Sequence, residues 1–349
     1  MPENRSRTTL SDIARATGLH YSSVSLALRD SPKIPIHTRN EVKMAAKKLG
    51  YIPDPMLKAL SVYRSHVRPK SFQATLAWVN SHPQRRDTTR TMMNEMNAAA
   101  RSYAAKLGYS VEEFWTQSPS LSGSARFSRV LRSRGIQGLL FAPQPVPDAR
   151  FELEWDDFSA IAFGYSLKEP QLHLVINHQY RTMRRILKEI RTLGYQRIGL
   201  CLSEEYDRRV DHNWSAGFWV DFAAQSETKR VPPLSYPTSA SLTRSEFFKW
   251  FKQHRPDVIV SGDTKLTEWL TEADIAIPEN VGFCATSLLS TERYFSGAYE
   301  NNGMVAQAGV DFLINLLQRG ERGVPKVPQR VLIDCIWLPG KTLRDVSND

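Results

Sequence analysis

The chain lacks the features that mark secreted, membrane or metal-binding proteins. Its 349 residues include only three cysteines, Cys201, Cys284 and Cys335, which lie far apart and show no CxxC spacing. We therefore expect reduced cysteines in the core of a cytoplasmic protein and no metal site. No charged segment followed by an apolar one opens the chain, as in a secretory signal. No apolar run approaches the roughly 20 residues that span a bilayer, so we expect no membrane partner.

Motifs of catalysis are absent as well. The sequence contains no Gly-rich phosphate loop, no HExxH and no nucleophile elbow. The stretch "SEEYDRRVD" (203–211) combines acids and bases, and we interpret it as a solvated loop rather than a catalytic pair. The sequence therefore predicts neither an enzyme nor a bound cofactor.

Positive charge is concentrated at the front of the chain. Residues 1–70 hold 13 Lys and Arg against 5 Asp and Glu, or 13 − 5 = +8, while the whole chain carries +10. The other 279 residues hold 33 basic and 31 acidic side chains, or +2. Such a concentration is typical of a surface that binds nucleic-acid phosphates.

The stretch "TLSDIARATGLHYSSVSLALRD" (9–30) predicts two short helices joined by a turn. Thr9 and Asp12 have the spacing of a capping box, and Gly18 can adopt the positive φ that ends a helix. Apolar residues recur with helical spacing in three segments: Leu10, Ile13 and Ala14; Val24, Ala27 and Leu28; Val42, Ala46 and Leu49. The pattern favours a helix-turn-helix that places the front of its second helix in the DNA major groove. An ordinary three-helix bundle would show the same periodicity, and the charge favours the DNA-binding alternative.

Two stretches carry a family resemblance. "TLSDIARATGLHYSSVSLALRD" and "HTRNEVKMAAKKLGYIPDPMLKAL" resemble the DNA-binding module of the lactose-repressor/galactose-repressor (LacI/GalR) family of bacterial transcription regulators. The order T-L-x-D-I-A, A-x-G, V-S, T-R-x-x-V and L-G-Y-x-P extends over about fifty residues. Later motifs such as "LGYQRIGL" and "IPENVGF" match more loosely. The resemblance implies a homodimeric repressor that binds a palindromic double-stranded DNA operator and a small-molecule effector, with a sugar or glycoside as the expected class.

The resemblance also implies which residues contact DNA. They are Thr9, Tyr21, Ser22, Ser23, Ser25, Leu26, Arg29, Thr38 and Leu60. Base edges would be read by Tyr21, Ser22 and Leu26, whereas Thr9, Ser25 and Thr38 would hold phosphates. Leu60 would enter the minor groove from a hinge helix that forms on DNA. A linker helix whose leucine packs against its own protein is the alternative for Leu60.

Behind this module, strands alternate with helices, which predicts an α/β fold of parallel sheets. The predicted strands are 73–80, 109–114, 137–142, 160–163, 172–176, 197–202, 258–260, 281–285 and 331–337, and the predicted helices are 92–107, 180–193, 215–225, 247–253, 265–273 and 304–318. The resemblance implies a two-lobed core like that of periplasmic binding proteins. A transport binding protein would share this core, but it would need a signal peptide and would lack a basic helix-turn-helix.

The domain organisation follows from these elements. We expect a helix-turn-helix domain at 1–52 (the motif itself at about 10–29), a hinge helix and linker at 53–70, and the core at 71–349. Lobe 1 would comprise about 71–175 and 297–322, and lobe 2 about 176–292 and 328–349. The chain would cross between the lobes near 175–178, 290–297 and 320–330.

Ligands of such cores bind between the lobes, at loops that follow the carboxyl ends of strands. This placement selects seven candidate effector residues: Asn80, Gln144, Tyr165, Asn213, Trp214, Asp263 and Cys284. Sugar-binding members of the family usually carry polar anchors where this chain has Trp214, Gly262 and Cys284. Trp214 offers a flat apolar face in place of an arginine, so a small and highly polar effector would lose its main anchors. The alternative for Trp214 is simple core packing.

Overall fold

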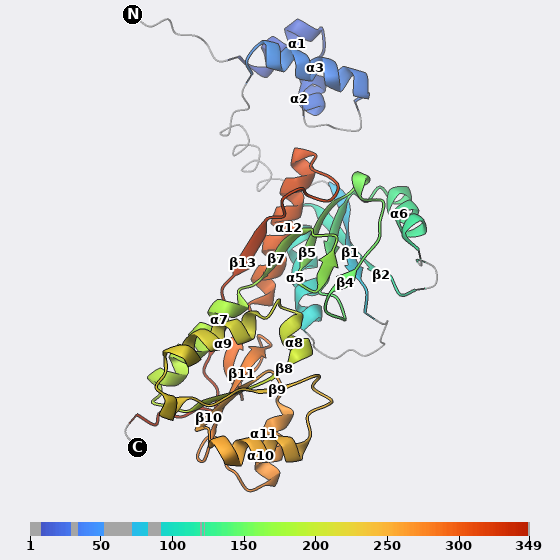
Figure 1. Ribbon diagram of the computed structural model, residues 1–349. Coiled ribbons are helices and arrows are strands. Elements are labelled where there is room, and N and C mark those ends of the chain that lie inside the picture. Colours follow the sequence, from blue (N-terminus) through green and yellow to red (C-terminus); the bar gives the residue numbers. More distant parts are fainter. Residues whose placement is uncertain are drawn as a thin grey trace, which may run out of the picture. The chain divides into compact units, whose positions relative to one another are not determined.

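The computed structural model describes residues 8–28, 34–51, 72–82, 92–118, 121 and 123–347 (Figure 1). The chain divides into two compact units, of which the second comprises Ala74–Ile314 and Arg322–Asp349. Arg29 and the predicted hinge segment 53–70, with Leu60, lie outside the described residues. Among the described residues, no helix is both long and apolar enough to span a membrane.

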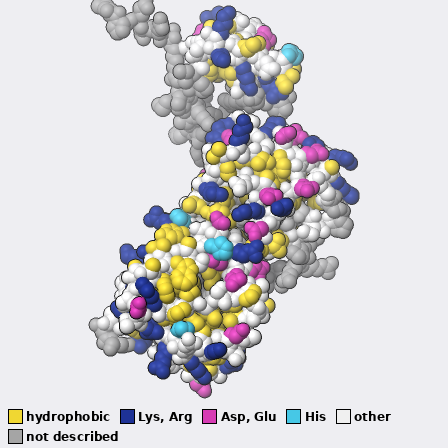
Figure 2. All heavy atoms as spheres, in the orientation of Figure 1, with side chains coloured by type: hydrophobic (Ala, Val, Ile, Leu, Met, Phe, Trp, Pro, Cys, Tyr) yellow, Lys and Arg dark blue, Asp and Glu magenta, His cyan; other side chains and the backbone are white. Residues whose placement is uncertain are grey.

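The N-terminal unit contains the three predicted helices, α1 (Leu10–Thr17), α2 (Tyr21–Leu28) and α3 (Ile36–Lys48). The Asp12 carboxylate accepts hydrogen bonds from the Thr9 backbone N–H (2.8 Å) and the Thr9 hydroxyl (2.7 Å) at the start of α1. Gly18 ends α1 with a φ of 66°. One apolar seam joins the helices, and its buried members are Ile13, Val24, Ala27, Val42 and Ala46. Among the charged side chains on the visible face of this unit, Lys and Arg predominate (Figure 2).

The prediction that Leu49 belongs to this seam is wrong, because Leu49 is 39% exposed. The chain turns at Gly50, which has a φ of 63°, and the Tyr51 N–H bonds to the Ala46 carbonyl (2.9 Å). This turn brings Tyr51, rather than Leu49, against the seam.

The core contains two six-stranded sheets. The first has the order β13 (Arg330–Ile333), β7 (His173–Asn177), β5 (Ser159–Phe163), β3 (Gly138–Phe141), β1 (Ala74–Asn80) and β2 (Tyr109–Trp115). The second has the order β14 (Ile336–Leu338), β12 (Ser296–Tyr299), β11 (Gly282–Leu288), β10 (Val258–Ser261), β8 (Ile198–Ser203) and β9 (Leu234–Tyr236). The two-stranded pair β4 (Ala149–Arg150) and β6 (Leu167–Glu169) completes the strands of the described residues.

The strands of the large sheets pair in parallel, except for β12 and β14, which are antiparallel. Strands β3, β5, β7 and β10 are buried on both faces, as expected of parallel sheets that are covered by helices. The predicted class of α/β core with parallel sheets is therefore confirmed.

Helices cover the sheets (Figure 1). The helices of the core are α5 (Met92–Lys106), α6 (Ser124–Ser133), α7 (Gln179–Thr192), α8 (Glu204–Arg208), α9 (Asn213–Ala224), α10 (Arg244–His254), α11 (Lys265–Glu272) and α12 (Asn302–Arg319). Around the second sheet, α7 and α9 lie on one face, with α10 and α11 on the other (Figure 1). The sequence did not predict α6, α8 or the short strands β4, β6, β9 and β12.

The prediction of a single strand at 331–337 is wrong, because these residues form two strands in different sheets. Strand β13 pairs with β7 of the first sheet, and β14 pairs with β12 of the second. Two arginines of α7 contact the crossing at residues 334–335. Arg185 donates to the Cys335 carbonyl (3.0 Å), and the Arg181 guanidinium lies 3.9 Å from the Asp334 carboxylate. A continuous apolar run cannot reveal that its two halves are covered by different sheets.

Two of the three crossings between the sheets lie at other residues than predicted. The first lies between β7 and α7, at the predicted 175–178. The second follows β12, which ends at Tyr299, and not at 290–297; the third lies at 334–335, and not at 320–330. Residues 297–299 thus belong to the second sheet and 330–333 to the first, opposite to the predicted lobe ranges.

Two glycines on α12 provide a matched test of this packing. A Cβ at Gly309 would collide with the ring of Phe163, which is itself buried against Trp78 at a centroid distance of 5.3 Å. A Cβ at Gly303 would find only the Tyr299 hydroxyl, at 3.9 Å. We expect Gly309→Ala to lower the free energy of unfolding by about 1–3 kcal/mol through overpacking. Gly303→Ala should leave it unchanged or raise it by up to about 1 kcal/mol. Urea denaturation of both variants measures the difference, and equal stabilities would contradict the packing of α12 on β5.

Candidate recognition helix and effector cavity

The outer face of α2 exposes side chains that its own unit does not use. Tyr21 is 49% exposed and Leu26 is 37% exposed, while Val24 and Ala27 on the other face are fully buried. Ser22 is exposed, and Ser23 and Ser25 are half-buried. Leu26 therefore lies off the buried face of α2. An exposed tyrosine and leucine beside small serines leave this face free to contact a partner.

The first turn of α2 is organised by His20, which is not among the predicted DNA-contacting residues. The Ser22 backbone N–H donates to His20 Nδ1 (3.3 Å), and the Ser22 hydroxyl lies 2.7 Å from the same atom. The free N–H groups of a first turn need such acceptors. The sequence signal that could have indicated this role is a histidine directly before Tyr21, the first residue of α2. His20 thus holds the hydroxyl of a predicted base-reading serine in one place.

The predicted phosphate-contacting residues are spread over the unit. The Thr9 hydroxyl donates to Asp12, so it serves the start of α1. Thr38 is half-buried in the first turn of α3.

A cavity of about 650 Å³ lies at the carboxyl ends of strands from both sheets. This volume falls within the range of roughly 300–1,000 Å³ that is typical of small-molecule sites. Most of its lining is apolar: Met92, Met93, Met96, Trp115, Pro143, Pro145, Phe163, Val175, Ile176, Val210, Trp214 and Val305. The polar lining consists of Asn80, His82, Asn94, Ser166, Asn177, Gln179, Tyr206, Arg209, Glu300 and Asn302.

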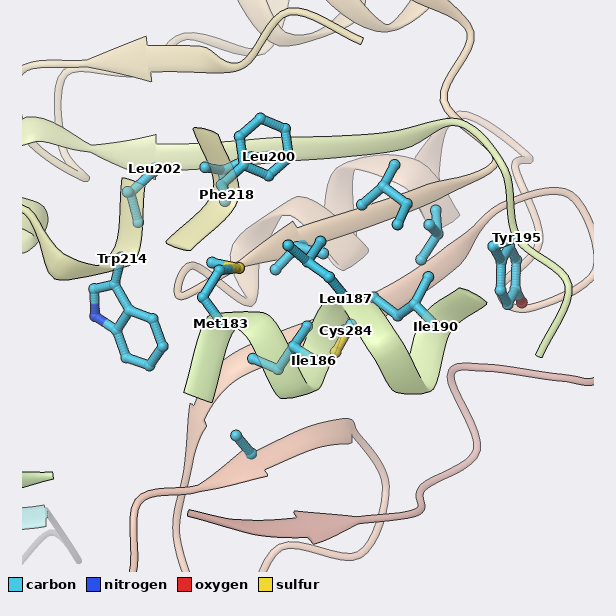
Figure 3. Packing of buried hydrophobic residues seen from close by; sticks show 14 of the residues in the cluster. Met183, Ile186, Leu187, Ile190, Tyr195, Leu200, Leu202, Trp214, Phe218 and Cys284 are labelled. Atoms are coloured by element: carbon cyan, nitrogen blue, oxygen red, sulfur yellow. The ribbon is translucent and has the colours of Figure 1, made fainter. Parts of the chain in front are cut away.

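Two of the seven predicted effector residues, Asn80 and Trp214, line this cavity. Trp214 is 1% exposed and lies at the edge of a core cluster, with its indole nitrogen pointing away from Met183 (Figure 3). That nitrogen has no hydrogen-bond partner among the described residues. Trp214 therefore packs in the core and also presents a polar atom that no described residue satisfies.

The other five predicted residues are not among those that line the cavity. The Gln144 carbonyl accepts from Arg209 (2.8 Å), while its side chain donates to the Ala142 carbonyl (2.7 Å). Tyr165 lies under the Arg330 guanidinium, and Asn213 donates to the Val210 carbonyl (2.7 Å).

Asp263 and Cys284 also point elsewhere. Asp263 pairs with Lys265 (3.2 Å) and accepts from Ser239. Cys284 is fully buried among the side chains under α7 and α9, and burial raises the pKa of its thiol. All three cysteines are free and buried, as expected. Position at a strand end is therefore insufficient, because the direction of the side chain decides whether it meets the cavity.

The interpretation of 203–211 as a solvated loop is wrong. Ser203 accepts from the Tyr206 N–H (3.2 Å) and starts α8. Asp207 is buried and joins α8 to α9, because it accepts from the Ser215 N–H (3.2 Å) and lies 3.2 Å from His212 Nδ1. Tyr206 and Arg209 consequently line the cavity. The signal that could have indicated this helix was the capping serine at position 203.

Tyr206 and Trp214 form an aromatic wall of the cavity. Their rings are stacked, with centroids 6.2 Å apart and an angle of 10° between the planes. Burial raises the pKa of the Tyr206 phenol, so it stays a neutral group.

Glu300 follows β12 at the second crossing and is 4% exposed. Its carboxylate accepts from Gln179 (3.2 Å) and Ser287 (2.6 Å), and its carbonyl accepts from Asn177 (3.1 Å). Burial raises the pKa of Glu300, and the bonds from Ser287 and Gln179 oppose this shift. Glu300 thus joins the first and second crossings at the cavity, a role that nothing in its sequence context indicated.

No group of three or more His, Cys, Asp or Glu side chains among the described residues is arranged to hold a metal ion.

Comparisons with known proteins agree with this organisation. Residues 9–54 match the family model "Bacterial regulatory proteins, lacI family". A curated relative, the probable HTH-type transcriptional repressor ExuR of Bacillus subtilis (strain 168), is 36% identical over 58 residues. That match spans only 17% of each of the two chains.

Solved structures resemble nearly the whole chain at low identity. The transcriptional regulator CelR in complex with cellobiose has a TM-score of 0.57 and 15% identity, covering 96% of this chain and 100% of that one. The lac repressor dimer bound to operator and the anti-inducer ONPF has a TM-score of 0.55 and 17% identity, covering 97% and 99%. These structures share the fold of the chain, and its first helices match the lacI family model over residues 9–54.

Proposed function

We propose that this protein is a sequence-specific DNA-binding transcription regulator, acting as a repressor, that binds a palindromic operator as a homodimer. The observation that carries the proposal is the outer face of α2, where Tyr21 and Leu26 are exposed. This helix lies within the first 70 residues of the chain, which carry a net charge of +8. The relative ExuR is named a repressor, and a structure of similar fold is a dimer on operator DNA. The proposed function is a binding role rather than a catalytic one, in the cytoplasm where operator DNA lies.

Tyr21, Ser22 and Leu26, with Ser23 close by, are the proposed base-reading residues. Ser25, Thr38 and Thr9 are proposed to hold phosphates, which position a protein without reading sequence. Arg29 and Leu60 lie outside the described residues and stay predictions, as does the division into a DNA-binding domain at 1–52, a hinge at 53–70 and a core at 71–349.

A small molecule in the cavity is proposed to control DNA binding. Helix α8 and the residue after it link the two halves of the core, since Arg208 pairs with Asp148 (2.6 Å) and Arg209 donates to the Gln144 carbonyl. A ligand changes an equilibrium between two arrangements only by binding one of them better. A rearrangement of the crossings near Glu300 would change the cavity, so that the effector binds one arrangement more tightly than the other. The carbohydrate class stays an expectation; cellobiose is bound in a structure of similar fold.

The proposal is tested by footprinting the full chain on DNA beside its own coding region and measuring affinity by gel shift. Tyr21→Ala should weaken specific binding by about tenfold or more, since one lost base contact costs roughly 1–3 kcal/mol. Met44→Ala, at an exposed position on α3, is the matched control and should bind as the wild type. A protected two-fold symmetric site is expected, and a site that Tyr21→Ala binds unchanged would contradict the placement of α2.

A further inference from the structure

The cavity holds a buried hydrogen-bond acceptor that the protein leaves without a donor. Five amide side chains line it, and four of them donate an N–H to the protein itself. The bonds join Asn80 to Glu113 (3.0 Å), Asn177 to the Glu300 carbonyl (3.1 Å), Gln179 to the Glu300 carboxylate (3.2 Å) and Asn302 to Glu95 (3.0 Å). The Gln179 side-chain oxygen has no partner among the described residues, although Gln179 is only 4% exposed. A ligand must supply a donor to satisfy this buried oxygen.

A buried carboxyl group without a counterion lies beside that oxygen. The Glu300 carboxylate is bonded by Gln179 and Ser287, which are both neutral. No ion pair of the described residues includes Glu300. The one described Lys or Arg side chain that lines the cavity, Arg209, donates to the Gln144 carbonyl, and the charge of Glu205 favours its cationic form. A buried carboxylate is costly without a cation, so the cavity favours a positively charged group beside Glu300.

The remaining walls suit an apolar body. The Tyr206–Trp214 stack, Trp115 and Phe163 present aromatic surfaces, and the methionines of α5 add adaptable apolar ones. Aromatic faces attract cations as well as apolar groups. An anionic ligand would be repelled by the Glu300 carboxylate.

We infer that the effector of this protein is an organic amine, in which a protonated nitrogen binds between the Glu300 carboxylate and the Gln179 oxygen and an apolar or ring body packs on Trp214 and Trp115. The inference rests on the proposed function, because it names the ligand class of the proposed effector cavity. It replaces the expected neutral carbohydrate by a ligand that is rich in donors and positively charged.

Isosteric probes test this inference by isothermal titration calorimetry on the full chain. The pairs are 2-phenylethylamine with 2-phenylethanol and glucosamine with glucose, and 3-phenylpropionate is the anionic probe. We expect the amine of at least one pair to bind about tenfold or more tightly than its alcohol, because hydrogen bonds to charged groups contribute more than neutral ones. Glu300→Gln should remove that preference, while Glu268→Gln, at an exposed position on α11, should retain it.

Each other outcome overturns the inference: alcohols that bind as tightly as amines, a preference for the carboxylate, or no binding by any probe. Should Glu300→Gln fail to fold, as judged by its thermal unfolding, the wild-type comparison alone decides. A gel shift of the same preparation separates the two proposals. Specific DNA binding without amine binding refutes this inference alone, whereas loss of specific DNA binding refutes the proposed function.

Discussion

Raising the salt concentration from about 50 to about 200 mM should lower the operator affinity of the full chain by roughly 10³- to 10⁵-fold, as for proteins that neutralise six to ten phosphates. The first 70 residues carry +8 of the chain's net +10, so a dimer would bring two such segments to one operator. Counterions released from the contacted phosphates cause the loss of affinity. Gel shifts at several salt concentrations give the slope of log affinity against log salt.

A chain of residues 72–349 is the control for this prediction. Residues 71–349 carry a net charge of +2. Residue 71 is an uncharged serine, so the shorter chain carries the same net charge. It should dimerise and show no salt-dependent DNA binding, with circular dichroism to verify that it is folded. If this shorter chain binds DNA as tightly as the whole one, the assignment of DNA binding to the N-terminal unit is wrong.

Leu26→Arg should shift operator preference toward guanine at one position of each half-site by roughly 1–3 kcal/mol, the contribution of one good bidentate pair to guanine O6 and N7. Leu26 is 37% exposed on the outer face of α2, so an arginine there would replace no core contact. Leucine can donate no hydrogen bond, and in the major groove it can contact only the thymine methyl group. We therefore expect the wild-type protein to prefer A·T at the position where the variant prefers G·C.

Selection of operators from a random DNA pool, run in parallel for both proteins, measures this shift. Met44→Arg adds the same charge at an exposed position of α3 and serves as the control. It should strengthen binding to all sequences alike, if at all, without a new guanine. Identical preferences of wild type and Leu26→Arg would mean that residue 26 does not face DNA, and the proposed role of α2 would fail.

The sequence by itself determined the features that depend on contacts between near neighbours. Thr9 and Asp12 are three residues apart, and Gly18 acts on its own turn, so the start and end of α1 could be predicted. Alternation of strands and helices likewise predicted the parallel sheets, because two parallel neighbouring strands need a crossover connection, which is usually a helix. Leu26 is not one of the helically spaced apolar positions Val24, Ala27 and Leu28, so its exposure agrees with the sequence pattern.

Tertiary structure alone decided which segments meet. The apolar run 331–337 looks like one strand, yet its halves pair with β7 and β12, which lie far apart in the sequence. Asp263 and Cys284 do follow or lie in the predicted strands, but side-chain direction turns them away from the cavity.

The cavity itself was beyond local reasoning. Glu300 and Gln179 are 121 residues apart and become partners only where two crossings come together. Arg209 meets the Gln144 carbonyl through a helix whose charged sequence resembles a solvated loop. Periodicity records that a residue is buried, but it carries no information about which distant group buries it, and the chemistry of this cavity depends on that pairing.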